Sequence, residues 1–269
     1  MGQPIEISQV KSDEIRYSIC TFVTRRSQYS EMVESYVSHG FSYDDCEYLY
    51  IDNSETNRYE AYAGINKFLT TAKGLYIIIC HQDVRLLQDD RKKLDSVIEE
   101  LDRLDPNWGV CGNGGGVHPG RFALRVTDPH GDNQFTERLP IRVSGLDENF
   151  LIVRRDANLA VSRDLRGFHL YGAELCIVAH FLGYTSYVVD FHLHHLSHGV
   201  KGPTFDPLRA SMIAKYRRSL RPQMVTTPST TIFLGRRMVL SSVLNSFVVV
   251  RLARRLGLLA VRLRSQGKA

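Results

Sequence analysis

Residues 75–80 read LYIIIC, and this short stretch decides the fold of the chain. Its apolar side chains occupy consecutive positions, which is typical of a strand that is covered on both faces within a parallel sheet. Residues 17–24 (YSICTFVT) and 47–52 (EYLYID) are also strand-like. We therefore predict a sheet with the strand at 75–80 in its middle.

Helical patterns alternate with these strands at residues 28–39, 59–71 and 90–104. Such alternation predicts a parallel sheet wrapped by helices, because parallel neighbours need a crossover connection. After Asp105-Pro106 the sequence becomes rich in Gly, Pro and short alternating runs, which indicates loops and hairpins. A helix at about 172–182 and a strand at 187–190 are expected to follow.

The charge of the 269-residue chain is unevenly distributed. Of its 34 Lys and Arg residues, 13 lie in residues 207–269, where there is no Asp or Glu; residues 1–206 keep 21 basic and 29 acidic residues, a balance of −8. An apolar content of 43% and a charged content of 23% exclude a disordered chain, a collagen-like repeat and a polytopic membrane protein. We predict a folded domain over 1–206 and a basic helical extension over 207–269.

The cysteines and the N-terminus indicate a cytoplasmic protein. Five cysteines without a C-x-x-C pair are expected to be buried free thiols in a reducing compartment. The N-terminus has no apolar stretch typical of a signal peptide, and the longest uncharged apolar window, residues 238–250, has 13 residues against the roughly 20 that span a bilayer.

Polar residues follow each of the first three predicted strands, at Thr24-Arg25, Asp52-Asn53 and His81-Gln82-Asp83. Ligands of doubly wound sheets bind at the carboxyl ends of the strands. Arginine suits a phosphate, and a carboxylate suits a base, a ribose or a cation that bridges a diphosphate. Each pair alone is also typical of a turn or a solvated helix start. Together they favour a nucleotide site.

Several stretches follow in an order that resembles a known family. They are YSICTFVT (17–24), YIDNSE (50–55), AGINKFLTTAKGLYIIICHQDV (63–84), NWGVCGNGGG (107–116), VSGLDENFLIVRR (143–155), FHLYGAELCIVAHFLGY (168–184) and HHLSHG (194–199). The chain resembles family 2 glycosyltransferases of the GT-A fold, especially a cytoplasmic subgroup grouped around a streptomycin-biosynthesis protein. The resemblance implies an α/β fold of the GT-A type, with a mostly parallel central sheet flanked by helices. It also implies sugar transfer, with inversion, from a nucleotide-sugar donor to a glycan, a lipid-linked molecule or a small molecule.

The resemblance also implies roles for individual residues. It assigns contact with the base to Asp52, positioning of the nucleotide to Asn66, and metal binding to Asp83 and His195, with a diphosphate contact as the alternative for His195. Thr24, Arg25, Asn53 and His81 are included in the nucleotide-sugar site because they follow the predicted strands. His81 stands where the family has the first Asp of its D-x-D motif. Mn²⁺ or Mg²⁺ is the implied cofactor, and a set of one carboxylate and a histidine suits Mn²⁺ better.

An inverting transfer needs a carboxylate that takes the proton of the acceptor hydroxyl. Gly172 and Glu174 stand where many family members have a Glu-Asp pair, so the candidates for this base are Glu174, Asp147 and Glu148. We favour Glu174, because a carboxylate on an otherwise apolar helix is costly to bury without a partner. Asp147 is second. A purely structural acid at a helix start is the alternative for Glu174.

Two further motifs are assigned weaker roles. The stretch GNGGG at 112–116 lacks the spacing of a phosphate-binding loop and is expected to form a mobile loop over the donor site. The histidines at 192, 194, 195 and 198 have neither a nearby Cys nor an H-E-x-x-H motif, which argues against a structural zinc site.

The C-terminal extension predicts a basic amphipathic helix. Arg251, Arg255 and Arg262 share one helical face, and the leucines at 252, 256, 259 and 263 share another. We expect this helix to bind an anionic membrane surface, which would make the cytoplasmic protein peripheral to the membrane. Packing on the domain or on a second subunit of a homo-oligomer is the alternative. The scarcity of aromatic residues argues against nucleic acid.

Two other functions compete with glycosyl transfer. A sugar nucleotidyltransferase normally has a Gly-rich loop after its first strand, which TRRSQYS (24–30) lacks. A non-catalytic, membrane-associated scaffold with a degenerate GT-A fold is the other alternative, because His81 and Gly172 replace expected carboxylates.

Overall fold

The structure, a computed structural model, describes residues 15–199, 201–226, 228, 230–235, 238–252 and 255–256. The chain divides into two compact units, residues 1–209 and 210–269. Helix α5 (Phe205–Ser219) runs through the predicted boundary at residue 206. Of the predicted C-terminal helix, Leu259, Arg262 and Leu263 lie outside the described residues.

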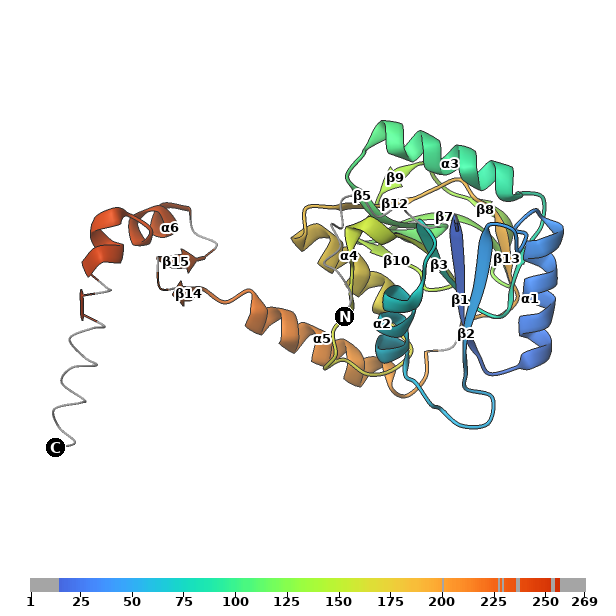
Figure 1. Cartoon of the computed structure of the whole chain (residues 1–269), viewed down its shortest axis with the longest axis horizontal. Coiled ribbons are helices and arrows are strands. Elements are labelled where there is room, and N and C mark those ends of the chain that lie inside the picture. Colours follow the sequence, from blue (N-terminus) through green and yellow to red (C-terminus); the bar gives the residue numbers. More distant parts are fainter. Residues whose placement is uncertain are drawn as a thin grey trace, which may run out of the picture. The chain divides into compact units, whose positions relative to one another are not determined.

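A seven-stranded sheet forms the centre of the larger unit (Figure 1). Its strands, in spatial order, are β2 (Cys46–Asp52), β1 (Tyr17–Val23), β3 (Tyr76–Cys80), β11 (Phe150–Arg154), β5 (Trp108–Gly112), β12 (Thr185–Val188) and β9 (Ile141–Arg142). Strands β1, β2, β3, β5 and β12 run in one direction, and β9 and β11 run in the other. The predicted α/β class, with a mostly parallel central sheet flanked by helices, is confirmed.

Helices cover both faces of this sheet. They are α1 (Arg26–Ser38), α2 (Ala61–Thr71), α3 (Arg91–Leu104) and α4 (Tyr171–Phe181). Ile19 of β1 belongs to the buried cluster that also contains residues of α1 and α3. Phe22, on the opposite face of the same strand, meets Phe68 of α2 with ring centroids 5.2 Å apart. The sheet therefore separates α1 and α3 from α2.

Helix α3 shows how the local sequence specifies these elements. The Asp90 side chain accepts a hydrogen bond from the Lys93 amide at 2.9 Å and so caps the first turn. The buried residues of this helix recur at helical spacing and are Leu94, Val97, Ile98 and Leu101. This apolar stripe faces the core, and the other side of the helix stays polar.

The expectation that residues 112–116 form a mobile loop is wrong. Gly112 ends β5, and Gly114–Gly116 belong to β6 in a second sheet. A Cβ on Gly112 would lie 2.7 Å from the Phe150 oxygen, and one on Gly115 would lie 2.5 Å from the Gly145 oxygen. The glycines therefore permit close backbone packing of neighbouring strands, which sequence reasoning took for a loop signal.

The larger unit contains a second sheet, which includes the strand that follows the carboxyl end of β3. Its strands, in spatial order, are β10 (Gly145–Leu146), β6 (Gly114–His118), β7 (Arg121–Asp128), β13 (Leu193–His195) and β4 (Val84–Leu86), and β8 (Gly131–Phe135) pairs with β7. Strand β4 follows β3 after a turn, so this turn joins the two sheets.

The smaller unit contains a hairpin and short helical segments. The hairpin consists of β14 (Gln223–Thr226) and β15 (Thr231–Leu234), and α6 (Met238–Leu244) follows it. Asn245 accepts a hydrogen bond from the Phe233 amide at 2.7 Å and donates one to the Phe233 carbonyl at 2.8 Å. This pair fixes the end of α6 to the hairpin. Within the described residues, no helix combines the length and apolar character needed to cross a membrane.

Candidate functional site

A tight turn at the end of β3 brings three potential metal ligands together. The His81 amide donates to the Asn149 carbonyl at 3.0 Å, and the Val84 amide donates to the His81 carbonyl at 3.3 Å. Strand β13 pairs antiparallel with β4 and places His195 opposite Val84. His195 therefore lies against the turn that carries His81 and Asp83.

The distances within this group suit one divalent cation. His81 Nδ1 lies 3.3 Å from His195 Nε2, and His195 Nε2 lies 3.6 Å from Asp83 Oδ1. All three ligand atoms lie within 4.8 Å of one another. Ligands bound at about 2.1 Å around one ion lie roughly 3.0–3.4 Å apart, so small side-chain movements would complete the geometry.

The environment shifts the pKa values of His81 and Asp83 in the directions that favour metal binding. Burial, with the neighbouring His195, lowers the pKa of His81 and favours its neutral imidazole. Burial opposes ionisation of Asp83, but its contacts with His195 and Ser197 outweigh this effect and hold the pKa of the carboxyl well below its ordinary value. Asp83 is therefore a carboxylate beside a neutral imidazole.

Glu148 lies close to this group and titrates differently. The Tyr171 hydroxyl lies 3.3 Å from both His81 Nε2 and the Glu148 carbonyl oxygen, so it links the two residues. Burial and the nearby Asp147 charge raise the pKa of the Glu148 carboxyl to about 8, although the amides of Leu170 and Gly172 donate to it. A carboxyl of this kind can exchange a proton near neutral pH.

Gly172 allows the start of α4 to approach Glu148. A Cβ at this position would lie 2.5 Å from the Leu146 oxygen and 3.5 Å from the Asp147 oxygen. Gly172 is therefore required for this close packing, which places the amides of Leu170 and Gly172 beside the Glu148 carboxyl.

Thr24 and Arg25 join the group through Gln82. The Gln82 side-chain oxygen accepts from the amides of Thr24 and Arg25 at 2.9 and 2.8 Å, and its nitrogen donates to the Thr24 hydroxyl at 2.7 Å. These bonds hold the end of β1 against the turn after β3. Thr24, Arg25 and His81 are thus neighbours, as their assignment to one ligand requires.

Asp52 and Asn53 lie at the end of the edge strand β2. Asp52 accepts from the amide and hydroxyl of Ser54 at 3.0 and 2.6 Å and pairs with Arg26; the Ser54 bonds are the main reason why the pKa of its carboxyl is lowered. The Asn53 side chain bonds backbone groups of Arg58 and Tyr59, so it shapes the loop after β2.

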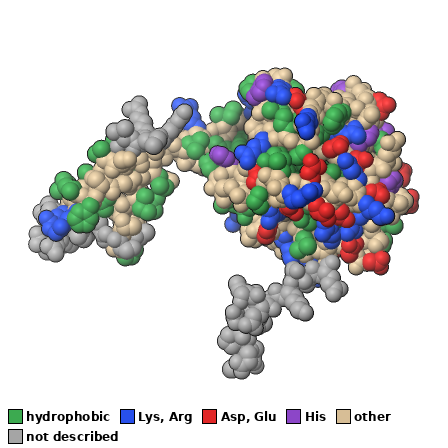
Figure 2. All heavy atoms as spheres, turned by 90° about the horizontal axis from the view of Figure 1, so that it is seen from above, with side chains coloured by type: hydrophobic (Ala, Val, Ile, Leu, Met, Phe, Trp, Pro, Cys, Tyr) green, Lys and Arg blue, Asp and Glu red, His purple; other side chains and the backbone are tan. Residues whose placement is uncertain are grey.

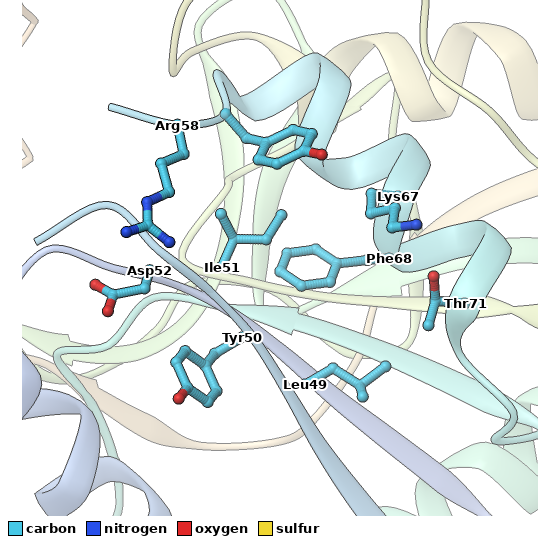
Figure 3. A pocket seen from close by; sticks show the side chains of 9 residues that line it. Leu49, Tyr50, Ile51, Asp52, Arg58, Lys67, Phe68 and Thr71 are labelled. Atoms are coloured by element: carbon cyan, nitrogen blue, oxygen red, sulfur yellow. The ribbon is translucent and has the colours of Figure 1, made fainter. Parts of the chain in front are cut away.

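A pocket of about 280 Å³ opens beside Asp52. Figure 3 shows Asp52 and Arg58 on one side of it and Lys67 and Thr71 of α2 on the other. The side chains of Ile51 and Phe68 form its apolar floor. An apolar surface bordered by a carboxylate and two basic groups suits a planar base with attached phosphates.

Asn66 and Glu174 hold a different segment of the chain. Asn66 donates to the Val161 carbonyl at 2.8 Å and accepts from the Val161 amide at 2.9 Å. The fully buried Glu174 accepts from the amide of Ser162 at 2.9 Å and from its hydroxyl. Both side chains thus anchor residues 161–162, and their assigned roles in donor binding and as general base stay predictions.

Asp147 is exposed and caps a turn. Its Oδ1 accepts from the amide of Asn149 at 3.0 Å and from the side-chain nitrogen of Asn149 at 2.8 Å. Its role as second candidate for the base also stays a prediction. The buried side-chain oxygen of Asn149 has no hydrogen-bond partner within the described part of the chain.

Sequence reasoning assigned no role to Tyr171 and did not specify what Gln82 contacts. Its assignment of His81 to the nucleotide and its third place for Glu148 among possible bases stay predictions. A pairing of β4 with β13 would have identified His81 and His195 as neighbours, but strands of three residues leave little pattern to read. The environment of Glu148 depends on α4, which is more than twenty residues away in the sequence, so local residue spacing does not predict it.

Comparisons with known proteins give one close match. No family model matches the chain. A protein of Fuscovulum blasticum described as "ATP synthase subunits region ORF 6" is 36% identical over 223 residues, which cover 80% of this chain and 89% of that protein.

Two solved structures are more distant. A197 from STIV aligns with a TM-score of 0.41 and 12% identity over 67% of this chain and 85% of its own. The mannosyltransferase PcManGT from Pyrobaculum calidifontis, in complex with GDP-Man and Mn²⁺, aligns with a TM-score of 0.48 and 12% identity over 78% of this chain and 63% of its own. With 36% identity across most of both sequences, the chain belongs to the family of the Fuscovulum blasticum ATP synthase subunits region ORF 6 protein.

Proposed function

We propose that the chain is a glycosyltransferase that moves a sugar from a nucleotide-sugar donor, with inversion, to a glycan, a lipid-linked molecule or a small molecule. One observation carries the proposal: His81, Asp83 and His195 converge at the carboxyl edge of the central sheet, and Tyr171 links His81 to the backbone of Glu148, whose carboxyl has a pKa raised to about 8. The ordered motifs that resemble family 2 glycosyltransferases support the same reaction.

His81, Asp83 and His195 would hold a divalent cation. Two imidazole nitrogens and one carboxylate oxygen suit Mn²⁺ or a similar transition metal better than Mg²⁺, which prefers oxygen ligands. A cation here would neutralise charge on the donor diphosphate as the bond to the sugar breaks. Thr24 and Arg25, held by Gln82, lie next to this position and would contact the same diphosphate.

The pocket beside Asp52 would receive the nucleoside of the donor. Asp52 would accept hydrogen bonds from the base or ribose, and Asn53 would act by shaping the loop that carries Arg58. Asn66 would contribute indirectly, by holding residues 161–162 against α2. The donor would then extend from the end of β2 to the turn after β3.

Glu148 is the general base in this proposal. Its carboxylate would take the proton of the acceptor hydroxyl while the acceptor oxygen forms a bond to the anomeric carbon. On the opposite face of the sugar, the bond to the diphosphate oxygen breaks and its electron pair leaves with the diphosphate. A base with a pKa near the working pH is efficient in such a step. The carboxylates of the other two candidates already accept hydrogen bonds within the chain, Glu174 from Ser162 and Asp147 from Asn149.

The chain is also proposed to act in the cytoplasm. All five cysteines are buried and free, which fits a reducing compartment.

Ligand-induced shifts of the melting temperature test the proposed function. The full chain is heated with nucleoside diphosphates and nucleotide sugars, GDP-mannose included, each with Mn²⁺, with Mg²⁺ and with a chelator. We expect stabilisation by at least one nucleotide that is larger with Mn²⁺ and is lost in Asp83→Asn. Failure of every nucleotide to stabilise the chain would contradict a donor site and favour a non-catalytic scaffold.

A further inference from the structure

Large apolar side chains are exposed throughout the described part of the smaller unit. Between 39% and 75% of the surface is exposed for Ile213, Leu220, Met224, Val225, Ile232, Leu234, Leu240, Val243, Phe247, Val248, Leu252 and Leu256. Figure 2 shows such side chains beside basic ones on this unit. An apolar surface this extensive is typical of an interaction site.

The hairpin exposes apolar side chains on both of its faces. Val225 pairs with Ile232 across the strands, and Met224 pairs with Phe233. Because side chains alternate along a strand, these two pairs point to opposite faces. A two-stranded hairpin has little stability of its own in water. Its surroundings must therefore cover both faces together.

The charge of the smaller unit has a single sign. Residues 210–269 contain 12 Lys and Arg residues and no Asp or Glu. Arg217 and Arg218 are exposed at the end of α5, and the guanidinium of Arg251 lies 5.8 Å from the ring centroid of Phe247. Basic and apolar side chains thus occur on the same segments, as they do in helices that lie in a membrane interface.

We propose that the smaller unit binds an anionic lipid bilayer at the depth of the headgroups. A bilayer interface surrounds a thin element and covers both faces of the hairpin, whereas one flat protein surface covers only one. The lipid phosphates match the positive charge. Deeper insertion is disfavoured because the outer edges of a two-stranded hairpin carry unpaired backbone groups. This inference does not depend on the proposed function.

Vesicle sedimentation of the full chain tests this proposal. Vesicles of phosphatidylcholine with about 30 mol% phosphatidylglycerol are compared with pure phosphatidylcholine at about 0.05 and 0.5 M NaCl. We expect binding to the anionic vesicles that weakens at high salt. The variant Arg217→Gln/Arg218→Gln should bind about 30-fold more weakly at low salt, as two basic residues near an anionic surface imply.

Two further variants complete the test. Val225→Thr/Ile232→Thr keeps β-branched residues in the hairpin but removes apolar surface, and it should weaken binding at both salt concentrations. Arg163→Gln/Arg166→Gln removes two exposed arginines from the larger unit and should leave binding unchanged. Equal binding to neutral and anionic vesicles would overturn the proposal, and so would unchanged binding in all three variants. A dimer that persists at high salt and does not bind vesicles would also overturn it.

Discussion

The two units of the chain treat charge in opposite ways. In the larger unit, basic side chains form ion pairs with acidic ones, among them Arg91 with Asp45 and Arg125 with Asp190. The smaller unit has no acidic residue for its 12 basic ones, and it holds half of the large apolar side chains that the described residues expose. The larger unit pairs many of its charges internally, whereas the smaller unit carries an excess of positive charge and no acidic residue of its own.

The largest expected effect is a loss of sugar transfer on mutation of the proposed cation site, with no change in the vesicle binding proposed for the smaller unit. Asp83→Asn should lower sugar transfer about 1000-fold and remove the Mn²⁺-dependent rise in melting temperature, because an amide oxygen is a poor substitute for the charged ligand. Vesicle binding should stay unchanged. Activity assays, melting curves and sedimentation of one preparation check this. Asp156→Asn is the control, because Asp156 is 66% exposed and pairs only with a neighbouring arginine of the larger unit. Full activity in Asp83→Asn would contradict the site.

The second effect concerns the interior of the larger unit. Glu174→Ala should lower the free energy of unfolding by about 3 kcal/mol, because it leaves the part-buried amide of Ser162 without its acceptor and opens a cavity at the fully buried position 174. Chemical denaturation measures this, with the exposed Glu99→Ala as the control. If Glu174→Ala abolished transfer at unchanged stability, Glu174 would be the base and Glu148 would not.

The third effect identifies the base. Glu148→Gln should lower the turnover number about 100-fold and leave nucleotide affinity within about twofold, because general-base catalysis acts on the acceptor hydroxyl alone. In the unchanged chain, activity should rise with pH and level off above about 8, as the carboxyl loses its proton. Rates measured from pH 6 to 9 for both chains check this. A pH profile that survives in Glu148→Gln would assign the ionisation to another group.

A pH-dependent effect on stability follows from the same carboxyl. Its folded pKa of about 8 lies above that of an unfolded glutamate, so the folded chain binds more protons between about pH 4.5 and 8. Stability should therefore fall as the pH rises through this window, by up to about 1.4 kcal/mol per pH unit. Glu148→Gln should remove that slope. Parallel slopes for the two chains in denaturant titrations would contradict the raised pKa.

The smallest effect tests the independence of the two units. Arg217→Gln/Arg218→Gln should change the free energy of unfolding of the larger unit by less than about 0.5 kcal/mol, because exposed side chains away from a core contribute little. Tryptophan fluorescence reports on this unit alone, since Trp108 is buried in it. A larger change would show that the two units are coupled.

Local patterns predicted the parallel half of the fold. The strands at 17–24, 47–52 and 75–80 and the helices between them depend on the period of apolar residues within one segment. The rest depends on contacts between distant segments. Strand β11 enters the sheet antiparallel between β3 and β5, and close glycine packing makes residues 112–116 part of two strands. No local period encodes either arrangement.

The same limit applies to the candidate site. The residues after each strand were identifiable because the carboxyl ends of parallel strands meet at one edge. Asn66 and Glu174 look equally functional in sequence, yet each bonds residues 161–162, which lie far from Asn66 along the chain. The raised pKa of Glu148 arises from burial around α4, and single-residue chemistry does not reveal it.

The close contact at Gly172 restricts how this family can change through mutation. An aspartate or glutamate at 172 would push the start of α4 away from the Leu146 carbonyl and so remove the amides that surround Glu148. A carboxylate at 172 and the hydrogen-bonded carboxylate at 148 are therefore mutually exclusive in this backbone. A descendant that gained a carboxylate at 172 would have to change both residues and the strand between them together.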